Sequence, residues 1–361
     1  QFTGGSQDVV YNSQFLQSNF YRDSEVQGQL APYLVLGSIT PPLSLIERCQ
    51  ALMNGIDNTN INVVKYGGNT FHALSDYWHS YELDPRTLET VQKANPPLPN
   101  AGVLNRLAPI PAASHPAKEY GTENYINFYS LVNPLPWDDH SLNIVRIKSA
   151  TETELLASIP RKDIPYMHSM ASTQDYAIIV AHPVYINWMT IATDQDPLQS
   201  LEYHHDKPTD IYVLHLHTKE LHHLQTEGFF FMHNINAFQD GDEIFVDETS
   251  YTDLSLMHAM KFDNIRASTP EWPSNMKGLI KRISINLSTK TANIKDFEMQ
   301  PGLEFVNNLD LPVINPDYHF HKYCFIYGQV LGDKGMEEVK LVKKDICSKG
   351  DKFWSKKNHY P

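Results

Sequence analysis

Three histidines stand at the edges of expected strands and lie far apart along the chain. His115 occurs in "PAASHPAKEYGTENYINFY", His168 in "PYMHSMASTQDYAIIV" and His233 in "FFFMHNINAFQDGDEIFVD". Each follows small or apolar residues, and a buried imidazole needs a hydrogen-bond partner or a metal. Spacings of 53 and 65 residues match no local metal motif. They are therefore either core histidines or ligands that the fold must assemble from separate strands.

Such a set of imidazoles would have a definite chemistry. Neutral imidazoles suit iron, zinc, copper or nickel, and three or four of them would leave a metal open to dioxygen. Carboxylates would then orient the rings through their second nitrogen. Asp76, in "HALSDYW", is an acid within an otherwise apolar strand and is the candidate for this role. The alternative is an ordinary acid at a turn or strand edge.

A second set of histidines is crowded into "EYHHDKPTDIYVLHLHTKELHH". His215 and His217 would share one strand face, which is the geometry that two metal ligands need. They flank a polar turn, however, and no carboxylate is placed to complete a site. We interpret this segment as a solvated hairpin; its histidines are His204, His205, His215, His217, His222 and His223.

The elements that must position these residues are mostly strands. Residues 61–93 alternate, turn at Gly67-Gly68, alternate again and turn once more at 84–87. Residues 209–225 and 280–297 repeat the pattern of strand, polar turn and strand. Further strands are expected in "ENYINFYSLV", "DYAIIVAHPVYI", "DEIFVD" and "KYCFIYGQV". The pattern predicts an all-β protein, and its recurrence favours a β-propeller over a sandwich.

One segment departs from this pattern. "TPPLSLIERCQALMNG" opens with prolines, ends at Gly55 and carries an apolar stripe at helical spacing. It predicts a short amphipathic helix that either packs on the body of the protein or lies in a membrane interface. The stripe consists of Leu45, Ile46, Cys49, Leu52 and Met53.

Composition narrows the class of protein. The formal charge of −13 argues against nucleic acid as a partner. Three cysteines without CxxC spacing indicate a reducing compartment, most simply the cytoplasm, rather than a disulfide framework. No apolar run is long enough for a membrane-spanning helix, and no signal peptide is recognisable. Because the chain starts at Gln1, we interpret residues 1–361 as a single domain that lacks part of both ends.

These motifs resemble the carotenoid cleavage oxygenase family, and most closely its animal branch. The resemblance rests on Ser114-His115-Pro116 ahead of Gly121, on "MHSMASTQDYAIIV" and on "FMHNINAFQDGDEIFVD", in the family's order. Residues 62–90 and "LDLPVINPDYHFHKYCFIYG" also match family segments. The resemblance therefore extends over essentially the whole chain.

The resemblance implies a seven-bladed β-propeller, incomplete in this chain, with non-haem Fe2+ on its axis. Three of the family's four histidine ligands correspond to His115, His168 and His233, and the fourth would lie beyond Pro361. Asp76 takes the place of a supporting glutamate that is one methylene longer, so contact with His168 is expected to need a backbone shift or a water. The family motif that contains His233 also has a glutamate, and this chain has Gln239 in its place. We do not expect this position to be a ligand.

The implied function is oxygenative cleavage of a double bond in a carotenoid or apocarotenoid, with O2 as the second substrate. The expected substrate tunnel would include Ser75, Tyr77 and Phe238. In relatives the segment around residues 40–55 faces a membrane, so peripheral membrane contact is expected as well. Two other functional hypotheses stay open. One is a retinyl-ester isomerohydrolase on the same scaffold, and the other is a carotenoid-binding propeller without catalysis.

Overall fold

The computed structural model describes residues 11–35, 41–102, 105, 109–133, 139–193, 197–267, 270–297, 299, 307–332 and 335–354. Within them, most strands belong to five four-stranded antiparallel sheets. The first contains β1 (Asn62–Tyr66), β2 (Thr70–Leu74), β3 (Ser80–Leu83) and β4 (Thr90–Ala94). The second contains β5 (Ala117–Lys118), β6 (Tyr125–Leu131), β7 (His140–Ser149) and β8 (Glu152–Arg161).

The other three sheets repeat this plan. The third contains β9 (Ala171–Ser172), β10 (Tyr176–Ala181), β13 (Thr209–His215) and β14 (Leu221–Thr226). The fourth contains β15 (Phe230–Asp240), β16 (Glu243–Tyr251), β17 (Leu279–Asn286) and β18 (Thr291–Asp296). The fifth contains β19 (Asp310–Val313), β20 (Phe325–Gly332), β21 (Gly335–Asp345) and β22 (Gly350–Trp354).

Smaller elements lie between and beside the sheets. β11 (Val184–Ile186) and β12 (Leu201–Tyr203) form a two-stranded ribbon. The α-helices are α1 (Asn19–Gln27), α2 (Leu45–Asn54), α3 (Trp188–Thr193), α4 (Ser255–Ala259) and α5 (Phe262–Ile265). Two 3-10 turns, η2 (Pro197–Ser200) and η3 (Pro316–Tyr318), complete the described elements.

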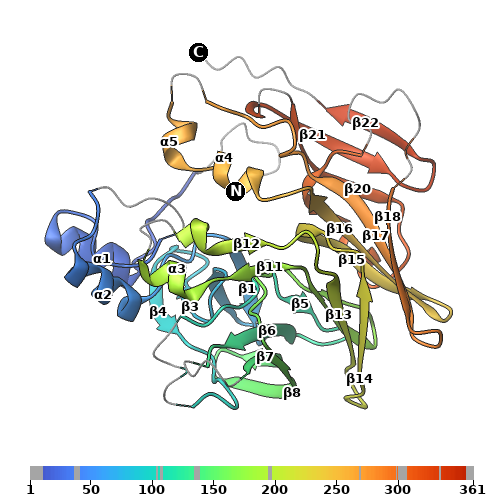
Figure 1. Ribbon diagram of the computed structural model, residues 1–361, viewed down its shortest axis with the longest axis horizontal. Helices are drawn as coiled ribbons and strands as arrows, with labels where there is room; N and C mark the ends of the chain where they lie inside the picture. The colour runs from blue at the N-terminus through green and yellow to red at the C-terminus, as the bar shows by residue number, and fades with distance from the viewer. Residues whose placement is uncertain are drawn as a thin grey trace.

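The sheets are arranged as blades. Figure 1 shows them following one another round the molecule, from the blue and cyan strands through β6–β8 to the red strands β20–β22. The edge strands β5, β9, β15 and β19 contact one another in that order, so they line the inside of the arrangement. The prediction of an all-β, propeller-like fold is confirmed.

The described residues form five blades, not seven; the seven-bladed propeller was expected to be incomplete in this chain. One sheet with its connections occupies a stretch such as Ala117–Arg161 or Phe230–Asp296. The five sheets together extend from Asn62 to Trp354.

The core lies between neighbouring blades, which explains the continuous apolar run in β10. Ala177 and Ile179 pack in the cluster shared with the second sheet, which contains Phe128 and Ile144. Ile178 belongs instead to the cluster shared with the fourth sheet. Because alternate residues of a strand point to opposite faces, a strand between two such clusters is apolar at every position.

The three predicted hairpins are confirmed, and their turns have the expected chemistry. β1 pairs with β2, β13 with β14, and β17 with β18. Gly67 and Gly68 both adopt the left-handed backbone conformation that L-residues with a Cβ adopt less readily. The turns of the other two hairpins place Lys219 and Lys290 in that same region.

The helix predicted from residues 41–55 is α2, and its ends are fixed as the sequence predicts. The Ser44 hydroxyl accepts from the Glu47 amide, and the Glu47 carboxylate accepts from the Ser44 amide, which together form a capping box. Gly55, at a positive φ, ends the helix. The idea that the whole apolar stripe packs on the body is wrong. Ala51 and part of Leu52 are covered, whereas the side chains of Leu45, Ile46, Cys49 and Met53 are exposed.

The prediction that the cysteines are unpaired is also wrong, because Cys324 and Cys347 form a disulfide. Cys324 immediately precedes β20 and Cys347 follows β21. The antiparallel register sets Phe325 opposite Asp345, so the two cysteines face each other across the hairpin. Their Cα atoms are 5.1 Å apart. Cys49 is free and exposed.

Candidate metal centre

The three sparse histidines meet at one point. One ring nitrogen from each of His115, His168 and His233 lies within 4.8 Å of the other two. The ring centroids are 4.8 to 5.1 Å apart, and each ring meets the next nearly edge to face. Among the described residues this is the group of three or more histidine, cysteine or acidic side chains that could hold a metal ion.

The fold explains why residues so distant in sequence converge. His115 lies just before β5, His168 just before β9, and His233 within β15. These are the inner edge strands of three successive blades, which contact one another. Each histidine thus occupies a similar position in consecutive blades, at the place where the blades are closest.

Asp76 orients His168 directly. Its Oδ1 lies 2.8 Å from Nδ1 of His168, and its Oδ2 accepts from the Tyr166 hydroxyl at 3.0 Å. The Ser114 hydroxyl also donates to Asp76. The expected backbone shift or bridging water is therefore not needed, because the aspartate itself reaches the ring.

Asp310, at the start of β19, plays the same part for His233 and was not predicted as a site residue. Its Oδ1 lies 2.7 Å from Nδ1 of His233 and accepts from the Thr249 hydroxyl at 2.9 Å. The Tyr251 hydroxyl donates to the other carboxylate oxygen. The signal available in the sequence was the acid of "LDLPVINPDY", a segment that matches the family without revealing its partner.

His115 has a weaker partner. Its Nδ1 lies 3.2 Å from the amide nitrogen of Asn62, whose amide also donates to the Ser114 carbonyl at 3.0 Å. Its Nε2 is buried and has no hydrogen-bond partner among the described residues. A buried, unpaired imidazole nitrogen that faces two further imidazoles is what a metal ligand requires, so the residues present fit a metal ion.

Burial and charge set the protonation of the site. Burial alone would raise the pKa of Asp76, but His168 and three hydrogen bonds outweigh it and lower that pKa. Burial would likewise raise the pKa of Asp310, and its contacts with His233 and Tyr251 lower it. Burial, followed by the charges of His168 and His233, lowers the pKa of His115 to about 3. Both carboxylates are therefore ionised, and His115 is neutral, which is the form that metal coordination needs.

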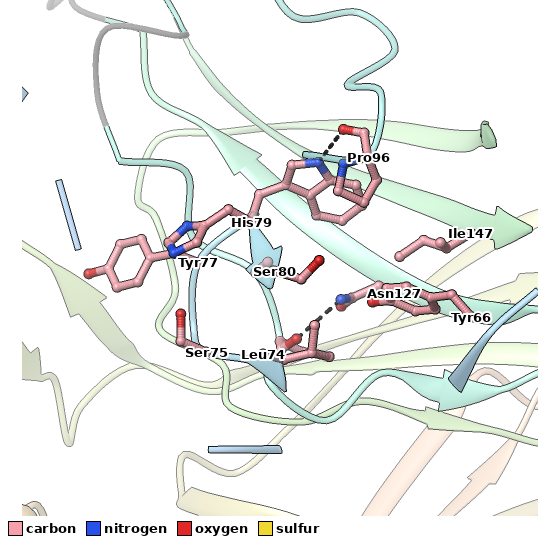
Figure 2. A pocket seen from close by; sticks show the side chains of 12 residues that line it. Tyr66, Leu74, Ser75, Tyr77, His79, Ser80, Pro96, Asn127 and Ile147 are labelled. Carbon is pink, nitrogen blue, oxygen red and sulfur yellow. Dashed lines mark hydrogen bonds between the residues drawn. The ribbon is translucent and has the colours of Figure 1, made fainter. Parts of the chain in front are cut away.

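The residues expected to line a tunnel have different surroundings. Ser75 and Tyr77 line a small pocket together with Trp78, His79 and Asn127, shown in Figure 2, and none of the three clustered histidines lines it. Tyr77 also lines a small apolar pocket beside Asp76, which includes Pro111, Ala112, Tyr166, Met167 and Ile186.

Phe238 lies in the core rather than beside the histidines. Its ring packs against Phe245 at 5.3 Å and is almost fully buried. It is five residues beyond His233 along β15, roughly 15 Å for an extended strand. Gln239, the next residue, is exposed and is therefore not a ligand, as expected.

An open cavity of about 490 Å3 reaches the histidine cluster. It is formed largely by residues that follow each histidine in the sequence. His115, Ser169 and Asn234 line it, with Asn236 and Phe320 further along. The small pocket beside Asp76 is formed instead by residues that precede the histidines, such as Ala112 and Met167. The cluster therefore has an apolar side and a more polar side.

The crowded histidines do not form a comparable cluster within the described residues. His223 bonds Asp210 at 2.9 Å, and Nδ1 of His215 accepts from two backbone amides of the turn. The interpretation of a solvated hairpin agrees with these local contacts. In the described part of the chain, no helix combines the length and apolar character needed to cross a bilayer.

Comparisons with known proteins agree with this geometry. Residues 1–361 match the family model described as retinal pigment epithelial membrane protein. Carotenoid isomerooxygenase of Galleria mellonella is 23% identical, with 98% of this chain and 70% of that protein covered. Human beta,beta-carotene 15,15'-dioxygenase is 22% identical, with 100% and 72% covered. The mitochondrial carotenoid-cleaving dioxygenase of Macaca fascicularis is also 22% identical, with 100% and 73% covered.

Solved structures share the fold at low sequence identity. Cobalt-substituted apocarotenoid oxygenase (ACO) of Synechocystis superposes with a TM-score of 0.73 at 17% identity, covering 95% of this chain and 68% of that one. A chimera of ACO and RPE65 gives a TM-score of 0.74 at the same identity and coverage. The match to the family model over the whole chain, on the fold and histidine cluster described above, shows that this protein belongs to the retinal pigment epithelial membrane protein and carotenoid oxygenase family.

Proposed function

We propose that this protein is an iron-dependent dioxygenase that cleaves a carbon-carbon double bond of a carotenoid or apocarotenoid with O2, giving aldehyde or ketone products. The observation that carries the proposal is the convergence of three imidazoles, two of them oriented by ionised carboxylates. Curated relatives named for carotenoid cleavage support the substrate class. The same names favour oxygen chemistry over retinyl-ester isomerohydrolysis.

His115, His168 and His233 would hold the metal through Nε2, because the other ring nitrogen of each has a partner. Imidazole ligands suit iron among several metals, and membership of the family favours Fe2+ over the others. When bound, Fe2+ would supply the activation of O2. Asp76 and Asp310 fix the two rings in place, so that the ligand set is formed before the metal arrives.

The remaining residues bind and shield the substrate. The pocket beside Asp76 is lined mainly by apolar side chains, which favour a polyene over water, but its volume of about 20 Å3 holds about one water molecule, so it would have to widen to admit the substrate. Tyr77 is the one residue of the expected tunnel that lines it. We therefore propose that the substrate approaches from this side. No side chain needs to act as a nucleophile.

An apolar face made by three helices would receive the substrate from a membrane. Leu45, Ile46 and Met53 of α2 are about three-quarters exposed, as is Met189 of α3, and Val26 of α1 is 88% exposed. Figure 1 shows α1, α2 and α3 gathered on one side of the molecule, and α2 contacts α3. Exposed apolar residues gathered in this way are typical of membrane or protein contact.

Binding to vesicles tests the membrane contact. We expect Leu45→Glu with Ile46→Glu to abolish co-flotation with lipid vesicles. Val91→Glu, which changes an apolar residue on β4 that is 55% exposed, should leave flotation unchanged. Flotation that survives the α2 changes would contradict the proposed face.

The cellular compartment stays a prediction. Several relatives are named as mitochondrial, and the disulfide removes the reason for expecting a reducing compartment. The cytoplasm, with peripheral membrane association, is the location that we propose for testing by cell fractionation.

The activity is tested by supplying the full chain with Fe2+ and β-carotene under air, under argon and under 18O2. We expect carotenoid loss under air alone, with 18O in both carbonyl products. The variant His168→Ala should show neither. Product formation under argon would favour isomerohydrolase-type chemistry, whereas carotenoid binding without iron or products would indicate a non-catalytic propeller.

A further inference from the structure

The inner strands that carry the three histidines are joined to one another in two different ways. Between the first two, the backbone makes the junction: the His115 amide donates to the His168 carbonyl at 3.2 Å, and the Met170 amide donates to the His115 carbonyl at 3.3 Å. This is a short parallel bridge that pairs His115 with Ser169. Their relative position is therefore fixed by main-chain atoms.

Between the second and third histidines, a single side chain makes the corresponding junction. The Ser169 hydroxyl donates to the Met232 carbonyl at 2.7 Å. It accepts from the Asn234 backbone amide at 3.1 Å and from the Asn234 side-chain amide at 3.0 Å. These three bonds use the one donor and two acceptor positions of a hydroxyl group. Ser169 is 3% exposed, so water does not compete for them freely.

The strand around His233 needs such a connection. The register between β15 and β16 shifts between Phe231 and His233, and shifts again between Asn234 and Asn236. A β-bulge on each side of a residue re-aims its side chain and weakens the local ladder. Ser169 bonds the two residues that flank His233: Met232, which lies within the first shift, and Asn234, which directly precedes the second.

We propose that Ser169 is a positioning residue of the metal centre, whose hydroxyl sets the place of the His233 imidazole relative to that of His168. The proposal rests on the metal centre proposed above. Metal coordination tolerates displacements of only about 0.2 Å in ligand distance, so a small shift of the His233 strand lowers the affinity for the metal. Loss of the hydroxyl would leave the Met232 carbonyl without its donor and the Asn234 amide without its acceptor.

Ser172 provides a matched control. It lies three residues further along the same inner strand, is 7% exposed, and donates its hydroxyl to the Lys118 carbonyl of the neighbouring strand at 2.8 Å. Ser172→Ala therefore removes the same chemical group and the same type of inter-blade bond. It does so away from the histidines.

Cobalt binding to the full chain measures the effect without any turnover. We expect Ser169→Ala to weaken Co2+ affinity about 10- to 100-fold and to change the visible d–d absorption of the bound cobalt, in the range of changes to groups that support metal ligands. Ser172→Ala should keep the wild-type spectrum and an affinity within about twofold of wild type. Thermal melting of both variants reports any common loss of stability.

Each outcome decides between distinct ideas. If the wild-type chain binds no Co2+ at the histidines, the proposed metal centre itself fails. If the wild type binds and Ser169→Ala binds equally well with the same spectrum, the positioning role fails while the metal centre stands. If Ser169→Ala does not fold, Asn234→Ala decides, because it removes only the side-chain bond to Ser169. That variant should weaken binding by about two- to tenfold, and unchanged affinity and spectrum would overturn the proposal.

Discussion

The two sets of histidines differ in a way that their sequence spacing does not suggest. Six histidines between positions 204 and 223 form no group of three that could hold a metal among the described residues, and serve local contacts. Three others, separated by more than fifty residues each, share one point. Proximity in the sequence places side chains along one hairpin, whereas the inner edges of successive blades bring distant residues together.

The partners of the two sets differ as well. In the crowded set, the side chain of His223 is 50% exposed beside Asp210, and that of His222 is 25% exposed beside Glu220. In the candidate metal centre the side chains of His168 and His233 are 7% and 12% exposed, and each has its own carboxylate. A largely buried ring that is bonded to a carboxylate is held in one orientation, whereas an exposed ring beside a carboxylate is held less firmly.

The largest expected effect comes from removing one of the three clustered histidines, and removal of a histidine from the crowded set is the matched control. We expect His233→Ala to weaken Co2+ binding more than about 100-fold, beyond the range for supporting groups, because it removes a ligand. His222→Ala should leave the affinity within about twofold of wild type. Isothermal titration of the full chain gives both values. Equal losses in the two variants would mean that the crowded histidines bind the metal.

Removing a carboxylate is expected to have the next largest effect. Asp310→Ala leaves the His233 Nδ1 without its partner, and we expect Co2+ affinity to fall about 10- to 100-fold. Asp210→Ala removes a carboxylate from a histidine of the crowded set and from Arg161. It should lower the melting temperature but leave metal affinity unchanged. An Asp310→Ala protein that binds cobalt like wild type would show that the carboxylate does not orient the ligand.

The sequence predicts hairpins with clear turn chemistry and fails where that chemistry is absent. Gly67-Gly68 and the two Thr-Lys turns mark three hairpins that the structure confirms. β7 and β8 are among the longest strands, yet they were not recognised. Their connection, Ser149 to Thr151, contains no glycine, proline or asparagine, and two register shifts interrupt the alternation between them.

The candidate site could likewise be predicted only where a residue stands out in its local sequence. Asp76 attracts notice because it is an acid in an apolar strand, and it does bond His168. Asp310 lies 77 positions from His233, so only the contact of β15 with β19 reveals the pair. The disulfide likewise depends on the register of β20 with β21, which no cysteine spacing encodes.

Glu248 is a buried carboxyl group without a partner in the described part of the chain, unlike Asp76 and Asp310. It is fully buried, and neither of its carboxylate oxygens has a hydrogen-bond partner among the described residues. Burial first, then the charge of Asp247, raises its pKa well above the usual 4.5, against the opposing effect of Lys281. The folded state therefore keeps a proton that the unfolded state loses above about pH 4.5. Its stability contribution is complete below that pH and is lost as the pH rises toward the folded-state pKa.

Glu248→Gln tests this pH dependence, since glutamine resembles the protonated acid at every pH. We expect the variant to match wild type in urea unfolding at about pH 4 and to be more stable by about 1–2 kcal/mol at about pH 8, in the lower part of the cost of an unpaired buried group. The same gap at both pH values would contradict a raised pKa. Cobalt affinity at the two pH values serves as a control that the metal centre is intact.

The smallest effect is expected at Asn62, the neutral partner of His115. Hydrogen bonds with an ionised partner are roughly twice as strong as neutral ones, so an amide should orient its ring less firmly than Asp310 does. We expect Asn62→Ala to weaken Co2+ binding less than about threefold. Asn54→Ala, which removes an exposed amide that bonds the Pro32 carbonyl, is the control for a general effect of losing an asparagine. If Asn62→Ala instead cost as much as Asp310→Ala, the charge of the partner would not matter, and the position of the ring alone would determine metal affinity.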